Sequence, residues 1–276
     1  MTRNSDQDDY LLGHGEREWD RLAEQHQLWR STLLGTLDRL GLARPGSSVL
    51  EVGCGNGALL ADLAERVGAN GRAAGVEKDP AAVERARAQA EPLPWTTIDE
   101  GDIFDLGATL ADDETFDLVV ARWVLSFLDR PQDAVAQLAA RVRPGGHLLI
   151  QDYIYDLIRM VPDVPALGHL FYDVMPGAYE QSGGDAWIGL RIPGFYSALG
   201  LDVVEVVPHA KAGGPDSPVF RWARRFFTEH LQSLIDTGLL NEAEGRASLN
   251  GWEDAAATGA TFYSPVVVDV VGRRPE

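Results

Sequence analysis

Glycines at alternate positions, preceded by an acid, are the residues of this chain best suited to chemistry. Gly53, Gly55 and Gly57 follow Glu51 at the end of a short apolar run, and an amphipathic pattern begins at Ala58. A turn without side chains lets a ligand lie against backbone N–H groups, and the start of a helix strengthens that binding. The spacing predicts a strand, a tight turn and a helix that together bind a nucleotide-like cofactor.

The glycine turn alone leaves two cofactors open. Gly53, Gly55 and Ala58 also satisfy G-x-G-x-x-A, and Glu77 lies about as far on as a dinucleotide site requires. This alternative is a nicotinamide-dependent oxidoreductase. Glu51 argues against it, because an acid beside the turn suits a positively charged ligand and is poorly suited to a pyrophosphate.

Three later segments favour a different cofactor. Gly101-Asp102-Ile103 follows a predicted strand, where the Asp102 carboxylate can accept a hydrogen bond from an adenine amine. An apolar strand over 116–121 leads into Arg122-Trp123, and a Pro-Gly-Gly turn follows at 144–146. In order and spacing, the chain from Val49 to about Asp152 resembles the class I S-adenosylmethionine-dependent methyltransferases. Its opening segment resembles small-molecule methyltransferases of bacterial secondary metabolism.

The resemblance implies that S-adenosylmethionine is the cofactor, S-adenosylhomocysteine the product, and no metal is required. Glu77 would hold both ribose hydroxyls, Asp102 the adenine amine, and Glu51 the methionine end. The cofactor-binding residues implied in this way are Tyr10, Glu51, Gly53, Gly55, Glu77, Lys78, Asp102, Ile103, Ala121 and Arg122.

A methyl group on a sulfonium is already electrophilic, so the protein mainly has to align the acceptor. A hydroxyl or protonated amine acceptor also requires a base nearby. His14 and His26 are the candidates, since the N-terminal segment closes over the cofactor in similar enzymes. His26 lies on an apolar stripe, where a histidine is more often a packed core residue than a base.

Aromatic and apolar residues without a clean period indicate a cap inserted over the carboxyl ends of the strands. We expect it to bind a large planar or apolar acceptor, which is methylated on oxygen or nitrogen. The expected substrate-binding residues are Trp123, Tyr153, Phe171, Tyr172 and Met175. Arg159 or Arg191 could meet an acidic group of the substrate. An alternative is a non-methylating cyclisation or rearrangement with the same cofactor, whereas a protein or RNA methyltransferase is disfavoured.

Composition narrows the partners and the compartment. The net charge of −18 argues against a nucleic-acid substrate, because phosphates require clustered Lys and Arg. The single cysteine, Cys54, fits a reducing cytoplasm, and no run is apolar enough to cross a membrane. We therefore expect a cytoplasmic enzyme of small molecules, with a homodimer as one candidate assembly.

Strand and helix patterns alternate along most of the chain, which is typical of a parallel sheet covered on both faces. The fold class we expect is α/β, with a Rossmann-like, seven-stranded, mostly parallel sheet whose last strand the resemblance makes antiparallel. The expected parts are an N-terminal helical lid segment (1–46), a cofactor-binding core (47–152), an inserted cap (153–184) and a C-terminal part of the core with added helices (185–276).

Overall fold

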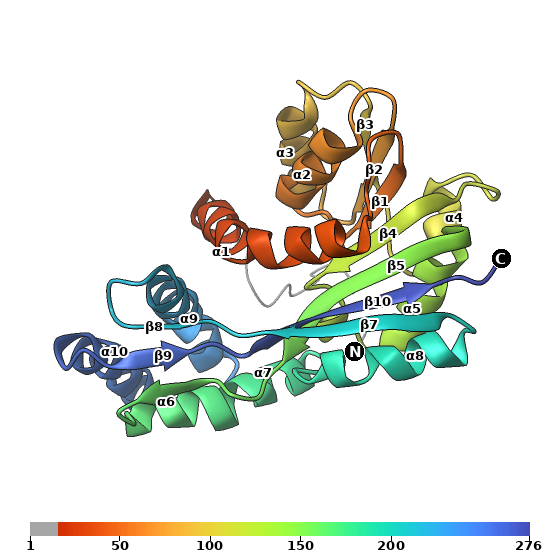
Figure 1. The fold of residues 1–276 in the computed structure, drawn as a ribbon. Coiled ribbons are helices and arrows are strands. Elements are labelled where there is room, and N and C mark those ends of the chain that lie inside the picture. The colour runs from red at the N-terminus through yellow and green to blue at the C-terminus, as the bar shows by residue number, and fades with distance from the viewer. Residues whose placement is uncertain (1–15) are drawn as a thin grey trace, which may run out of the picture.

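The computed structural model describes the backbone of residues 16–276 and side chains from Trp19 on, so Tyr10 and His14 lie outside the described residues. A seven-stranded sheet runs through the molecule (Figure 1). Its strands in spatial order are β3 (Thr96–Glu100), β2 (Arg72–Glu77), β1 (Ser48–Val52), β4 (Phe116–Arg122), β5 (Val142–Ile154), β10 (Val266–Arg273) and β7 (Asp202–His209). β10 is antiparallel to both of its neighbours, β5 and β7, and the other strand pairs of this sheet are parallel. The expected fold class is confirmed.

Helices cover both faces of this sheet. One apolar cluster joins one face to α1 (Glu16–Leu40), α2 (Ala58–Val67) and α3 (Pro80–Ala90). Another joins the opposite face to α4 (Leu106–Thr109), α5 (Pro131–Ala140) and α8 (Ile192–Ala198). Adjacent residues of β1 divide between them, with Val49 in the first cluster and Leu50 in the second. A strand buried on both faces reads as a continuous apolar run, which is why this one was recognisable.

A cap with its own core stands beside the sheet. It contains the small sheet β6 (Arg159–Val161), β9 (Thr261–Tyr263) and β8 (Ala212–Gly213). Its helices are α6 (Pro165–His169), the π-helical turn η2 (Leu170–Val174), α7 (Met175–Gln181), α9 (Pro218–Asp236) and α10 (Glu242–Ala257). A third apolar cluster, which we call the cap cluster, packs all five helices together around Phe171, Phe227 and Trp252.

The cap therefore draws on two separate stretches of chain, whereas the sequence suggested only 153–184. Helices α9 and α10 were expected as additions to the core, but their apolar faces pack into the cap cluster. Between the two stretches of the cap, a 3-10 turn, η3 (Ile188–Leu190), precedes α8. A further 3-10 turn, η1 (Leu125–Phe127), follows β4.

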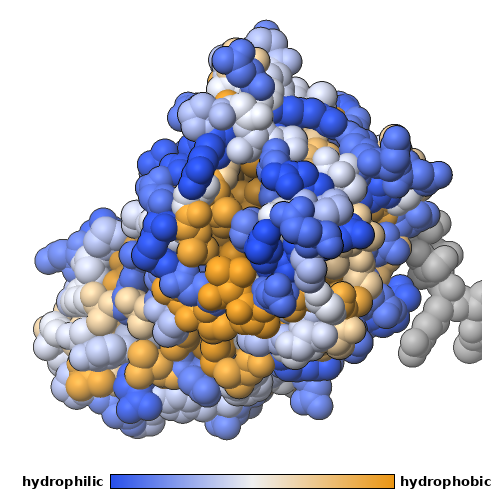
Figure 2. All heavy atoms as spheres, turned by 45° about the vertical axis from the view of Figure 1, so that its right-hand side comes forward, coloured by the Kyte–Doolittle hydropathy of each residue, from blue (hydrophilic) through white to orange (hydrophobic). Residues whose placement is uncertain are grey.

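Apolar groups also gather along the middle of one face of the molecule, between hydrophilic ones (Figure 2). The exposed apolar side chains include Val203, Val204 and Val206 on the edge strand β7. None of the helices in the described part of the chain is both long and apolar enough to cross a membrane. The homodimer stays a prediction.

Candidate active site

A cavity of about 640 Å³ lies between the carboxyl ends of the parallel strands, helix α1 and the cap. One end of it is formed by the glycine turn after β1 and by the residues that follow β2 and β3. The other end is formed by side chains of α1, α7 and α9. In an open α/β sheet, ligands bind beyond the carboxyl ends of the strands, and this cavity is in that place.

The structure brings most of the residues expected from the sequence into the wall of this cavity. They are His26, Glu51, Gly53, Gly55, Glu77, Lys78, Asp102, Ile103, Arg122, Trp123 and Tyr153. Ala121 does not line it, because its side chain is buried in the cluster that packs α5 against the sheet.

Phe171, Tyr172 and Met175 do not line the cavity either, although the sequence analysis expected them to bind substrate. Phe171 and Met175 are buried in the cap cluster, and the Phe171 ring lies 4.8 Å from that of Phe227. Tyr172 is 49% exposed on the surface. A helix in a cap has an inner and an outer face, and an irregular run of aromatic residues does not reveal which is which.

Two glycines of the turn, Gly55 and Gly57, serve different purposes. Gly53, Gly55 and Gly57 have φ values of 71°, 54° and 82°, where other residues are strained. A Cβ on Gly57 would lie 3.0 Å from Ala86, so this glycine lets α3 approach the turn. A Cβ on Gly55 would meet nothing within 4 Å, and Gly55 lines the cavity. Gly55 therefore keeps backbone open to a ligand.

Glu77 is held at the end of β2 by backbone hydrogen bonds. Its carboxylate accepts from the N–H groups of Gly55 at 2.7 Å, Lys78 at 2.8 Å and Asp79 at 3.0 Å. At the end of the neighbouring strand β3, Asp102 accepts from the N–H of Phe104 at 2.8 Å. The ammonium of Lys78 lies 4.0 Å from the carboxylate of Asp102. Two carboxylates are thus fixed side by side along the rim of the sheet.

Deeper in the cavity, Glu51 faces an arginine. Glu51 is buried, and its Oε2 atom has no hydrogen-bond partner among the described residues. Burial raises the pKa of Glu51 to about 8, with Arg122 opposing that shift and Glu77 adding to it. The Nη1 atom of Arg122 is also buried and without a partner among the described residues.

These two atoms provide a test of the cofactor that the sequence implies. A carboxylate oxygen and a guanidinium nitrogen line the same cavity, and buried polar atoms are ordinarily paired. The methionine part of S-adenosylmethionine carries an ammonium and a carboxylate, which match this pair of groups. Glu51 and Arg122 therefore fit the methionine end, while Glu77 and Asp102 fit the ribose and the adenine.

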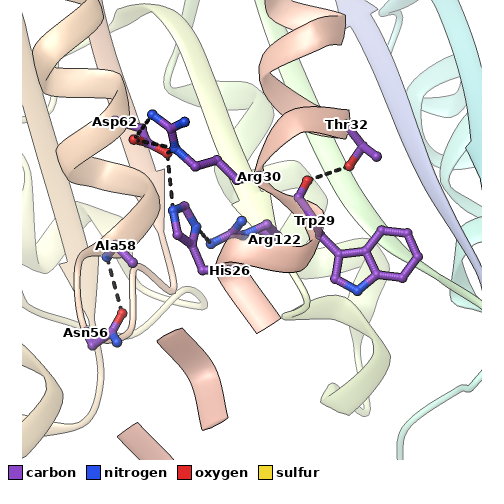
Figure 3. Close-up of polar contacts among 8 residues, drawn as sticks. All are labelled: His26, Trp29, Arg30, Thr32, Asn56, Ala58, Asp62 and Arg122. Atoms are coloured by element: carbon purple, nitrogen blue, oxygen red, sulfur yellow. Dashed lines mark hydrogen bonds and ion pairs between the residues drawn. The ribbon is translucent and has the colours of Figure 1, made fainter. Parts of the chain in front are cut away.

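His26 holds Arg122 in place (Figure 3). Its Nδ1 atom lies 3.0 Å from Nη2 of Arg122, and its Nε2 atom lies 3.2 Å from Asp62. Because a guanidinium can only donate, Nδ1 accepts and the proton is on Nε2, which donates to Asp62. Both ring nitrogens are engaged, so His26, one of the two candidate bases, acts in this structure as a support for Arg122.

Asp62 completes this chain of contacts. Arg30 of α1 binds it through three hydrogen bonds of 2.7–2.9 Å. Burial acts to raise the pKa of Asp62, but the hydrogen bonds from His26 and Arg30 outweigh it and hold that pKa below its usual value. Asp62 is therefore a carboxylate that anchors the imidazole. The sequence analysis did not identify it, because it lies on an ordinary amphipathic helix.

Aromatic residues dominate the other half of the cavity. Trp123, with a φ of 55°, stacks on Tyr153 with ring centroids 6.1 Å apart and planes 14° apart. The guanidinium of Arg122 lies 4.6 Å from the centre of the Trp123 ring. Trp222 and Phe226, one turn apart on α9, face the same space. The amphipathic pattern of α9 was visible in the sequence, but not the element it packs against.

Comparison with known proteins agrees with this site. A family model described as a methyltransferase domain matches residues 43–187, just over half of the chain. An uncharacterized 37.1 kDa protein in transposon TN4556 of Streptomyces fradiae is 34% identical over 139 residues, which are 50% of this chain and 38% of that protein. A ribosomal protein L11 methyltransferase of Ralstonia nicotianae is 37% identical over 149 residues, 54% of this chain and 44% of that one. These matches span less than half the length of either relative.

Solved structures share the fold at low identity. A putative methyltransferase from Bacillus halodurans has a TM-score of 0.60 and 19% identity, over 88% of this chain and 99% of that one. A geranyl diphosphate C-methyltransferase from Streptomyces coelicolor, solved with S-adenosyl-L-homocysteine, has a TM-score of 0.53 and 15% identity, over 95% and 85% of the two chains. With the matching family model, the sheet order and the fit of the cavity to S-adenosylmethionine, this chain belongs to the class I S-adenosylmethionine-dependent methyltransferases.

Proposed function

We propose that this protein transfers the methyl group of S-adenosylmethionine to an oxygen or nitrogen atom of a small acceptor with an aromatic or apolar body. The observation that carries this proposal is the continuity of the cavity. A single space runs from the glycine turn and the two rim carboxylates to a wall of tryptophan, tyrosine and phenylalanine rings. Such a wall suits a planar small molecule.

The half of the cavity formed by the glycine turn and the two rim carboxylates is the cofactor half, and its residues bind and orient the cofactor. S-Adenosylmethionine, when bound, supplies a methyl group on a positively charged sulfur. Glu77 and Asp102 hold the nucleoside part, while Glu51 and Arg122 hold the amino-acid part. Asp62 and His26 keep the Arg122 side chain in one orientation, which limits the positions that the reacting end can take.

In the acceptor half, the rings of Trp123 and Tyr153 form a flat surface beside Arg122. The cap and α1 form two of the walls of this space. A cavity walled by aromatic rings favours a small planar molecule over an extended protein segment. The name of the Ralstonia relative indicates a protein acceptor, but that similarity covers less than half of the relative's length.

Calorimetry tests the cofactor part of this proposal. We expect S-adenosylmethionine and S-adenosylhomocysteine to bind with micromolar-scale Kd, and Glu77→Ala and Asp102→Ala each to weaken binding about tenfold or more, since each removes a charge-assisted hydrogen bond. Asp99→Ala, on the exposed side of β3, is the matched control and should leave Kd unchanged. Absence of binding of either compound to the wild-type protein would rule the proposal out.

Mass spectrometry of the product tests the reaction. Incubation with S-adenosylmethionine and a panel of phenolic and amine acceptors should yield a product heavier by one CH₂ unit, together with S-adenosylhomocysteine. Turnover of an acceptor without that gain in mass would instead support a non-methylating cyclisation or rearrangement.

A further inference from the structure

The acceptor half of the cavity contains a buried tyrosine whose hydroxyl has no partner in the described part of the chain. Tyr155 directly follows β5, lines the cavity and has 6% of its surface exposed. Its ring packs in the cap cluster, with its centroid 6.0 Å from that of Tyr179. Its hydroxyl keeps accessible surface but makes no hydrogen bond to any described residue. Because buried polar groups are ordinarily paired, this hydroxyl is suited to bind a ligand.

Tyr196 shows how another buried tyrosine of this protein is paired. It is 0% exposed and lies outside the cavity, in the cluster that packs α8 against the sheet. Its hydroxyl lies 3.3 Å from the carbonyl oxygen of Leu148 and 3.2 Å from that of Val270, to which it can donate. The hydroxyl of Tyr196 therefore serves the fold, whereas that of Tyr155 is left to the cavity.

The surroundings keep the Tyr155 hydroxyl protonated. Burial is the main cause and the neighbouring Tyr153 is the second, and together they raise the pKa of Tyr155 above its ordinary value. A neutral phenol donates hydrogen bonds better than it accepts them, because its oxygen lone pair is delocalised into the ring. The hydroxyl therefore suits a ligand atom that accepts a hydrogen bond.

The surroundings also favour a neutral ligand atom over a charged one. Tyr179, whose ring contacts that of Tyr155, lies 5.4 Å from the ring of Phe127, and all three residues line the cavity. Arg159 and Arg191, which the sequence suggested for an acidic group of the acceptor, are exposed and do not line it. A charge is costly among aromatic rings, while a carbonyl oxygen needs only the one hydrogen bond.

We propose that Tyr155 selects the acceptor, because its hydroxyl donates a hydrogen bond to a carbonyl oxygen of a neutral, planar aromatic molecule. This inference rests on the proposed function, since it names the substrate class of the same site. The rings of Trp123 and Tyr153 hold the aromatic body next to the cofactor half. A molecule without the carbonyl leaves the buried hydroxyl unpaired, and this cost discriminates against it.

Two probes of similar shape test this inference. 2-Acetylnaphthalene carries the carbonyl oxygen, and 2-isopropenylnaphthalene has a CH₂ group in its place. Their Kd values are measured by equilibrium dialysis, with S-adenosylhomocysteine present so that the cofactor half is occupied. Tyr155→Phe removes the hydroxyl and keeps the ring. We expect this variant to raise the Kd of the ketone about tenfold and to keep that of the alkene within about threefold of the wild-type value.

Tyr196→Phe is the matched control, because it makes the same change at a buried tyrosine outside the cavity. It should keep the wild-type Kd of both probes and lower the Tm by roughly 1–4 °C, since a buried hydrogen bond is lost. Tyr155→Phe should not lower the Tm, because its hydroxyl has no partner among the described residues. The two variants thus separate a hydroxyl that binds a ligand from one that supports the fold.

Several outcomes would overturn the inference. They are an unchanged Kd of the ketone in Tyr155→Phe, an equal change for both probes, and binding of neither probe to the wild-type protein. A Tyr155→Phe protein that does not fold, or whose Tm falls as far as that of Tyr196→Phe, would show that the hydroxyl serves the fold and would overturn it too. All of these outcomes leave the proposed function intact when S-adenosylhomocysteine binds the wild-type protein. Failure of that binding strikes the proposed function instead.

Discussion

At the scale of single residues, the buried carboxyl group of Glu51 has the largest influence on the charge of the cofactor site. Glu51 lies at the end of β1 and is buried, and this burial raises its pKa to about 8. In the cofactor-free protein the group is therefore protonated at neutral pH. An ammonium favours the carboxylate, so binding of the cofactor should release the proton.

The affinity for S-adenosylhomocysteine should consequently rise with pH. Between pH 6 and 8 we expect Kd to fall by up to about tenfold per pH unit, and to level off once Glu51 is ionised in the free protein. Calorimetry in buffers of different ionisation enthalpy would detect the released proton. Glu51→Gln should bind more weakly at pH 8 and show a flat profile. If Glu51→Gln keeps the pH dependence of the wild-type protein, a group other than Glu51 titrates.

The same pKa affects the stability of the free protein with the opposite sign. The folded state holds the Glu51 proton more tightly than the unfolded chain, whose ordinary pKa is 4.5. The stability from this group is complete below that pH and is lost as pH rises through about 8. Comparing the Tm of the wild type and Glu51→Gln across this range would check the prediction, and the variant should lose less stability at the alkaline end.

His26 gives a second prediction at this scale. His26→Leu removes the link between Arg122 and Asp62, although Asp62 keeps its bonds to Arg30. We expect the Kd of S-adenosylhomocysteine to rise about tenfold because Arg122 is no longer oriented. His26→Gln, whose side chain can accept and donate hydrogen bonds, should recover part of that loss. If His26 only filled space, Leu would replace it better than Gln. His169→Leu, which breaks an exposed histidine–aspartate pair of 2.9 Å, is the control without effect.

At the scale of elements, the strand–turn–helix unit separates packing from binding. Gly55 and Gly57 both have positive φ, but only Gly57 is crowded, by Ala86 of α3. The same substitution at the two positions should therefore have different consequences.

We expect Gly57→Ala to lower the free energy of unfolding by about 1–3 kcal/mol, from backbone strain and the contact with α3. Gly55→Ala carries the strain without the contact, so it should destabilise less. Its added methyl group lies at the cavity, and it should weaken binding of S-adenosylhomocysteine more strongly than its stability loss would suggest. Urea unfolding and calorimetry on both variants check this, and identical effects on both quantities would contradict it.

At the scale of the whole molecule, the cofactor and the acceptor are served by different cores. The sheet and its helices support the glycine turn and the rim carboxylates. The cap cluster supports α9, which brings Trp222 and Phe226 to the cavity. Acceptor binding should thus be separable from cofactor binding.

Trp252→Ala tests this separation. Trp252 is 1% exposed at the centre of the cap cluster, and its removal should cost about 3–5 kcal/mol of stability, mostly within the cap. We expect the Kd of a planar aromatic acceptor that the wild-type protein methylates to rise severalfold, while that of S-adenosylhomocysteine changes little. Leu249→Ala, on the same helix and 45% exposed, should change neither. Equal loss of both ligands would show that cap and core act as one unit.

The sequence by itself determined the cofactor half of this protein. The glycine turn, Glu77 and Asp102 each lie at the end of a strand, and parallel strands bring those ends to one edge, so their positions in the chain predict their meeting in space. Arg122 and Trp123 could be named for the same reason.

Only the tertiary structure decided the acceptor half. Arg21, Gln25, Trp222 and Phe226 lie on helices nearly 200 residues apart in the chain, and an amphipathic pattern shows that a helix has a buried face without showing what it is buried against. The same ambiguity led Phe171 and Met175 to be expected at the cavity, although they pack inside the cap. Which residues meet the acceptor depends on how α1 and α9 pack, and that packing is not local in the chain.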